Sequence, residues 1–146
     1  MSNMEIGRKI EIDMGHRIPE HKSQCRNVHG HRYVIWAKVS GALEEKGSSR
    51  GMVQDFGDIK EVLMREIHCS LDHGFMYAGF DEMMKDFFIK NPGMKHLEVD
   101  FVPTAENIAR WCFERVDGYL TNRNRTLESI EVWETPNSIA TYKINQ

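Results

Sequence analysis

The chain has 146 residues and a mass of 17.0 kDa, so we expect a single domain over residues 1–146 with one hydrophobic core. Its net charge of −3 and pI near 6.2 argue against a nucleic-acid partner. The sequence has no apolar run of membrane-spanning length and no charged-then-apolar leader, which argues against a membrane protein. Three cysteines without a disulfide-framework spacing indicate a reducing compartment, so we expect a cytoplasmic protein.

Two strands are predicted in the first third of the chain. Residues 5–15 form the first, because three isoleucines lie on one face and charged residues alternate with them on the other. Residues 17–27 are polar, contain a proline and are expected to form a loop. The second strand runs from His29 to about Ser40 and is rich in β-branched and aromatic residues. Its apolar residues fall on both faces, which indicates helices on one side and a partner subunit on the other.

A helix is predicted after the Gly- and Ser-rich turn of residues 41–51. Asp55 is a suitable N-cap, and apolar residues recur at helical spacing as far as Ile67. Cys69, near the end of this helix, is predicted to be a core thiol. Asp72 and His73 follow at the helix exit, where they could be a reactive pair presented on a loop. The alternative is a C-terminal histidine favoured by the helix dipole, with Asp72 as a solvated partner.

The second half of the chain predicts two more helices and two more strands. Residues 80–89 form a short helix that the Asn-Pro-Gly of residues 91–93 ends. Thr104 caps a long helix whose apolar stripe includes Cys112 as a small buried residue. Two strands, residues 127–135 and 139–144, then form a hairpin.

The main elements follow the order ββααββ. This order predicts an α+β fold, a four-stranded antiparallel sheet with two helices packed on one face. The other face of the sheet and its edge strands would still need partners. Assembly of several copies of the chain would supply both.

A thiol and two imidazoles lie within the seven residues from Cys25 to His31. On a strand, His29 and His31 would point to the same face, roughly 6.6 Å apart, close enough to bind one metal ion. A catalytic zinc site takes three protein ligands and leaves the fourth position open, and His16 is the best candidate for the third. Cys25 has two interpretations, a fourth ligand that closes a structural site or a reactive thiolate beside the metal.

The chain resembles the 6-pyruvoyl-tetrahydropterin synthase and 6-carboxy-tetrahydropterin synthase family, whose members have the tunnelling fold (T-fold). Six segments carry the resemblance in the same order as in the family, and together they span most of the chain. They are residues 16–19 (HRIP), 25–31 (CRNVHGH), 51–56 (GMVQDF), 71–73 (LDH), 103–107 (PTAEN) and 132–135 (VWET). The sequence before His16 and the length of residues 76–102 depart from the common pattern.

The resemblance implies a role for each matched residue. It implies that His16, His29 and His31 bind Zn²⁺ and that Cys25 is the catalytic thiol. Asp72 and His73 would complete the catalytic set as an acid–base pair. Glu134 would anchor the pterin ring by accepting two parallel hydrogen bonds, and Thr104 would contact the substrate. A surface glutamate at a strand end is the alternative for Glu134.

The resemblance also implies a reaction and an assembly. Three residues between Cys25 and His29 are typical of the carboxy-forming branch, which acts on 7,8-dihydroneopterin triphosphate in queuosine biosynthesis. The pyruvoyl-forming reaction and a non-enzymatic protein with a closed structural zinc site are the alternatives. The family assembles as a homohexamer of two stacked trimers, closed into a barrel, with active sites shared between subunits. Lys22, Arg26 and Arg17 are triphosphate-binding candidates or simply solvated loop charges.

Overall fold

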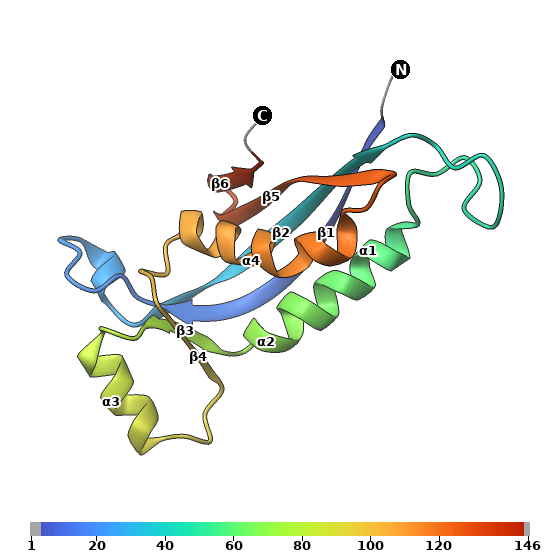
Figure 1. The fold of residues 1–146 in the computed structure, drawn as a ribbon. Helices are drawn as coiled ribbons and strands as arrows, with labels where there is room; N and C mark the ends of the chain where they lie inside the picture. Colours follow the sequence, from blue (N-terminus) through green and yellow to red (C-terminus); the bar gives the residue numbers. More distant parts are fainter. Residues whose placement is uncertain (1–3, 145–146) are drawn as a thin grey trace.

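The computed structural model describes residues 4–144, which form one curled mixed sheet with helices on one side (Figure 1). The strands are β1 (Met4–His16), β2 (His29–Gly41), β3 (Phe75–Ala78), β4 (His96–Val99), β5 (Arg125–Thr135) and β6 (Ser138–Lys143). The helices are α1 (Phe56–Leu63), α2 (Cys69–Leu71), α3 (Glu82–Lys90) and α4 (Ala105–Leu120). A 3₁₀ turn (Gln24–Arg26) precedes β2, and a π-helical turn (Met64–His68) joins α1 to α2. The predicted α+β class is confirmed.

Four of the strands form the predicted antiparallel sheet. β1 and β2 pair along their whole length, from Met4 opposite Gly41 to His16 opposite His29. β5 pairs with β2, and β6 pairs with β5 across a tight turn. The register is set by burial, because a shift of one residue would move every apolar side chain of a strand to the opposite face.

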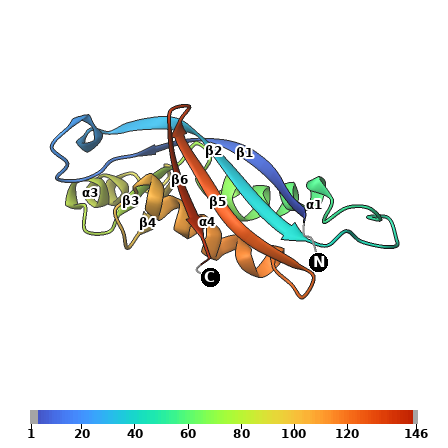
Figure 2. The ribbon, with the colours of Figure 1, turned by 90° about the horizontal axis from the view of Figure 1, so that it is seen from above.

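The core lies between this sheet and the helices α1 and α4. Figure 2 shows both helices on the same face of the sheet. Alternate residues of β1 and β2 point toward them and are buried, namely Ile10, Ile12, Met14, Tyr33, Ile35, Ala37 and Val39. Each large apolar side chain buried in this way contributes about 1.5–3 kcal/mol relative to an exposed one. None of the helices within residues 4–144 is long and apolar enough to span a membrane.

The sheet has six strands rather than the predicted four, in the order β4-β3-β1-β2-β5-β6. The two extra strands come from the segment around residues 76–102, and both are parallel to their neighbours. Each has only four residues, too few for an alternating pattern to stand out in the sequence. The absence of a side chain at Gly15 allows β3 to approach, since a Cβ there would lie 2.6 Å from the Phe75 ring.

The two long helices begin where the sequence predicted. Asp55 caps α1 by accepting a hydrogen bond from Gly57 N–H, and Thr104 caps α4 by accepting one from Asn107 N–H. The prediction that Cys69 is a core thiol was wrong, because Cys69 is exposed. It lies midway between the buried residues Ile67 and Leu71, and on a helix that position faces the opposite side.

Candidate metal centre and active site

Three histidines meet at the end of β1 and the start of β2. His16 pairs directly with His29, and His31 lies two residues further along β2, so all three side chains point to the helix-covered face of the sheet. One ring nitrogen of each can be chosen so that all three lie within 4.8 Å of one another. This spacing could hold a single metal ion.

The hydrogen bonds of the rings leave nitrogen lone pairs available to a metal. His16 Nδ1 lies 2.7 Å from the carbonyl oxygen of Pro103, and His29 Nδ1 lies 2.7 Å from that of Asn27. A carbonyl only accepts, so Nδ1 carries the proton in both rings and Nε2 has a free lone pair. The Nε2 atoms of His16 and His31 are buried and have no hydrogen-bond partner among residues 4–144. Buried polar atoms normally have a partner, so these residues fit a metal centre.

Burial also favours the form of histidine that binds metals. It lowers the pKa of His16 and His31, because the imidazolium ion loses solvation inside the protein. The negative charge of Glu134 opposes this effect at both rings. Near neutral pH the two rings are therefore held in the neutral state that donates a lone pair to a metal.

Cys25 lies beside this cluster without belonging to it. It is in the 3₁₀ turn of the loop between β1 and β2, half-buried, and its backbone oxygen accepts a hydrogen bond from Ile18 N–H. Within residues 4–144, the one group of side chains spaced to bind a metal consists of the three histidines alone. This geometry favours a three-histidine site over a closed site with a fourth, sulfur ligand.

Glu134 faces the three histidines from β5. Its Oε1 atom lies 3.5 Å from His31 Nε2, and its side chain is 21% exposed. The pairing of β5 with β6 is irregular between Trp133 and Thr135, and such bulges often redirect a side chain. Thr104 follows Pro103, the residue that binds His16, and its oxygen is already engaged as the α4 cap.

Asp72 and His73 form a pair at the edge of β1. Their side chains are joined by a 2.7 Å hydrogen bond between Asp72 Oδ2 and His73 Nδ1. Asp72 Oδ1 also accepts from Asp13 N–H, and His73 N–H donates to the Asp13 carbonyl, so the pair occupies the backbone groups of Asp13. His73 has a left-handed φ of 61°, and its side chain is 77% exposed.

The sheet keeps this pair apart from the three histidines. His73 lines a shallow hollow with Asp13 and Arg32, and the side chains of Asp13 and Arg32 form an ion pair on the face away from the helices. The histidines point to the opposite face. One protomer therefore presents two parts, a cluster with Cys25 and Glu134 beside it, and a separate Asp72–His73 pair.

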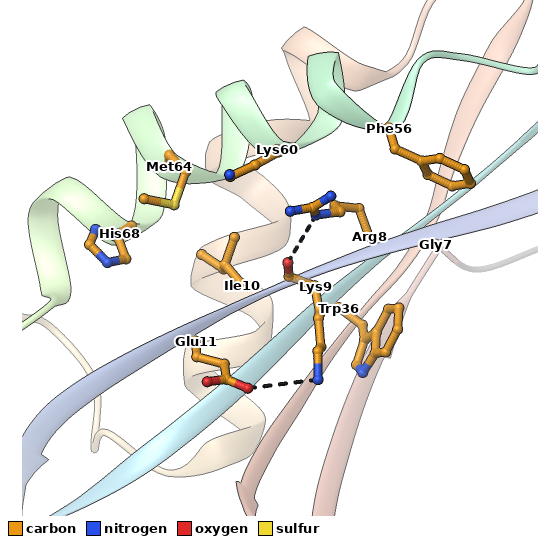
Figure 3. A pocket seen from close by; sticks show the side chains of 10 residues that line it. All are labelled: Gly7, Arg8, Lys9, Ile10, Glu11, Trp36, Phe56, Lys60, Met64 and His68. Carbon is orange, nitrogen blue, oxygen red and sulfur yellow. Dashed lines mark hydrogen bonds and ion pairs between the residues drawn. The ribbon is translucent and has the colours of Figure 1, made fainter.

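A groove of about 620 Å³ runs between the first helix and β1 (Figure 3). Lys60, Met64 and His68 line it on the helical side, and Arg8 and Ile10 line it on the strand. Within residues 4–144, β3 pairs with β1 only at Gly15 and His16, so the groove follows a strand edge that has no β partner. None of the predicted site residues lines it.

Sequence reasoning missed two residues near the site. Tyr33 lies two residues after His31 and therefore on the same face, a signal that strand alternation offered. His68 approaches Asp72, with Nε2 3.6 Å from Oδ2, and it also lines the groove. Of the basic candidates, Arg17 is bound to Asp81 at 2.8 Å, and this carboxylate is buried. Arg26 donates to the backbone of Lys22.

A sequence model of the 6-pyruvoyl tetrahydropterin synthase family matches residues 5–145. The chain belongs to this family. A Haemophilus influenzae protein named 6-carboxy-5,6,7,8-tetrahydropterin synthase is 33% identical over 141 residues, covering 95% of this chain and 98% of that protein. A Rickettsia conorii protein of the same name is 36% identical over 131 residues, covering 89% and 93%.

Solved structures support the family's T-fold. An uncharacterized protein from Wolinella succinogenes has a TM-score of 0.83 at 22% identity, covering 99% of this chain and 100% of that one. The 6-pyruvoyl tetrahydropterin synthase of Caenorhabditis elegans has a TM-score of 0.71 at 26% identity, covering 99% and 98%. The predicted T-fold is thus confirmed, with two strands added to the four-stranded sheet.

Proposed function

We propose that this protein is a zinc-dependent 6-carboxy-5,6,7,8-tetrahydropterin synthase that acts on 7,8-dihydroneopterin triphosphate in the cytoplasm. Its product would enter queuosine biosynthesis. The observation that supports this most is the three-histidine cluster, which leaves two buried Nε2 atoms free and has a carboxylate 3.5 Å from one of them. The relatives from Haemophilus influenzae and Rickettsia conorii carry the name of this activity.

Each residue of the cluster has a part in binding. His16, His29 and His31 would hold the zinc ion, and the Pro103 and Asn27 carbonyls keep two of the rings oriented. Glu134 would accept hydrogen bonds from the 2-amino group and N3–H of the pterin ring, which orients the substrate side chain toward Cys25. Thr104 would contact the substrate through its hydroxyl proton, because its oxygen already caps α4.

The chemistry needs proton transfer on the substrate side chain. Zinc supplies Lewis-acid polarisation of the side-chain oxygens. Cys25, as the thiolate, removes a proton from a side-chain carbon, and His73 exchanges a proton with a side-chain oxygen while Asp72 orients its ring. One water molecule is consumed as triphosphate leaves. Cleavage of a carbon–carbon bond then releases acetaldehyde and leaves the 6-carboxy product, so the remaining atoms balance without an external oxidant or reductant.

The two separated parts of the protomer indicate an active site shared between subunits. His73 is exposed and lies where β3 leaves the β1 edge, next to the part of that edge without a β partner. A neighbouring protomer that extended the sheet there would bring its own cluster toward this pair. We propose a homohexamer of two stacked trimers, in which β1 and β6 edges meet and the sheets close into a barrel.

The test is product identification by mass spectrometry after incubation of the zinc-loaded protein with 7,8-dihydroneopterin triphosphate. We expect 6-carboxytetrahydropterin and an equal amount of acetaldehyde. The 6-pyruvoyl compound without acetaldehyde would instead assign the pyruvoyl-forming reaction. Absence of any turnover, with one sulfur ligand detected by zinc X-ray absorption, would indicate a structural zinc protein.

A further inference from the structure

Tyr33 has a buried hydroxyl group with nothing to bind. It lies on β2 opposite Ile12, and its side chain has 0% exposure. The hydroxyl has no hydrogen-bond partner among residues 4–144. A buried hydroxyl without a partner is unfavourable, because it has given up its hydrogen bonds to water. Such a group calls for a partner that binds later.

The hydroxyl belongs to the same pocket as the proposed metal ligands. The Tyr33 ring packs edge-on against His16 and His31, with centroid distances of 5.8 and 5.5 Å. The β2–β5 pairing ends with Val34 opposite Trp133, so Tyr33 and Glu134 are the next residues in that register. Two orphan Nε2 atoms and one orphan hydroxyl therefore lie in one pocket.

The hydroxyl is suited to donate a hydrogen bond and not to act as a base. Burial raises the pKa of Tyr33 well above its ordinary value, and the charges of Glu134 and Cys25 act in the same direction. These two residues are the ones proposed to contact opposite ends of the substrate. A hydroxyl close to both would meet the part of the substrate between them.

We propose that the Tyr33 hydroxyl donates a hydrogen bond to the substrate ring nitrogen next to the side chain, N5. The inference rests on the proposed function and assigns one more residue to the same site. With the 2-amino edge on Glu134 and the side chain toward Cys25, N5 is the acceptor at the junction of ring and side chain. In the 7,8-dihydropterin this nitrogen is an imine with a free lone pair.

The hydrogen bond would contribute to the reaction as well as to binding. When the Cys25 thiolate takes a proton from the side-chain carbon attached to C6, the electron pair of the broken C–H bond delocalises through C6=N5 onto nitrogen. A fixed donor at N5 stabilises this negative charge as it develops. The product then carries hydrogen on N5.

The test compares two ligands and two proteins. We would measure the Kd of a 6-substituted pterin and of its 5-deaza counterpart, which has C–H in place of N5, on the zinc-loaded wild-type protein and on Tyr33→Phe. Loss of one neutral hydrogen bond should weaken pterin binding by roughly tenfold. The 5-deaza compound should bind the two proteins equally. Equal weakening of both ligands, or no weakening of either, would overturn the proposal.

A stability measurement on the free protein supplies a second readout. Tyr33→Phe should leave Tm unchanged or raise it, because the substitution removes an unpaired buried hydroxyl. Tyr77→Phe is the matched control, since Tyr77 is buried but its hydroxyl donates to Glu98 at 3.3 Å. The control should bind both ligands normally. A fall in the Tm of Tyr33→Phe would show a partner in the free protein and contradict the proposal.

The proposed function can fail separately. A wild-type protein that binds neither ligand would contradict that function and with it the role of Tyr33. A wild-type protein that binds the pterin, beside a Tyr33→Phe variant that binds it equally well, would contradict the Tyr33 inference alone.

Discussion

His16 Nδ1 lies 2.7 Å from the carbonyl oxygen of Pro103, although 87 positions separate the two residues in sequence. The bond joins the end of β1 to the segment that opens α4. It also determines which ring nitrogen of His16 faces the other two histidines, because the carbonyl can only accept. The packing of α4 on the sheet thus orients a metal ligand.

The first prediction concerns the metal. His29→Ala should lose bound zinc, because two imidazoles without the third are a weak site and His29 lies at the chain position where the strands meet. Zinc content per chain, measured by atomic emission, checks this. His21→Ala is the control, since His21 bonds to Ser23 in the loop and lies outside the cluster. Stoichiometric zinc in His29→Ala would refute the ligand assignment.

The second prediction concerns the thiol. Cys25→Ala should retain zinc and pterin binding but lose turnover by about a hundredfold or more, the usual scale for a lost general base. Steady-state kinetics and zinc content together separate the two effects. Cys69→Ala, at an exposed cysteine on α2, should keep the wild-type rate. A near-normal rate in Cys25→Ala would remove this thiol from the mechanism.

The third prediction tests whether the active site is shared. Cys25→Ala and His73→Ala should each be inactive as pure oligomers. If Cys25 and His73 from different subunits form each site, subunits exchanged at equal amounts should regain about a quarter of the wild-type activity, because that share of sites has both groups intact. No recovery, despite mixed oligomers detected by native mass spectrometry, would indicate that both residues act within one chain.

The fourth prediction is a pH dependence of stability. The hydrogen bond from Asp13 N–H, followed by His73 and His68, holds the pKa of Asp72 below its ordinary value. A lowered pKa in the folded state stabilises the protein above the unfolded-state pKa of about 4, and this stability is lost as pH falls further. Asp72→Asn should therefore be less stable than wild type at pH 7, with a smaller difference near pH 3.

Urea unfolding at the two pH values measures that difference. Asp58→Asn is a suitable control, because Asp58 is an exposed residue in the first turn of α1 and makes no contact with β1 backbone groups in the hydrogen bonds of residues 4–144. A difference between wild type and Asp72→Asn that stays constant from pH 7 to 3 would show that the charge of Asp72 does not support the fold.

The fifth prediction separates two roles of Thr104. Thr104→Ala should lower the free energy of unfolding by about 1 kcal/mol, because the N-cap of α4 is lost. Thr104→Asp retains a capping oxygen but has no hydroxyl proton, so it should stay near wild-type stability while pterin binding weakens. Normal pterin affinity in Thr104→Asp would leave Thr104 as a helix cap only.

Local patterns were enough to predict most of the fold. The alternation of β1 and β2, the caps Asp55 and Thr104, and the hairpin of β5 and β6 depend on neighbours in sequence, and all lie where predicted. The strands β3 and β4 could not be predicted, because each is stabilised by pairing with a strand distant in the chain. The exposure of Cys69 depended on the helical phase between Ile67 and Leu71, which was misjudged.

The sequence by itself determined which residues carry chemistry, because the spacing of His29 and His31 on a strand and the six ordered segments are local facts. The tertiary structure alone decided how those residues are grouped. The pairing of β1 with β2 placed His16 opposite His29, while the thickness of the sheet separated Asp72 and His73 from that cluster. The same pairing buried the Tyr33 hydroxyl without a partner among residues 4–144. Burial and the side of a sheet on which a group lies arise from contacts between distant segments, which no local pattern contains.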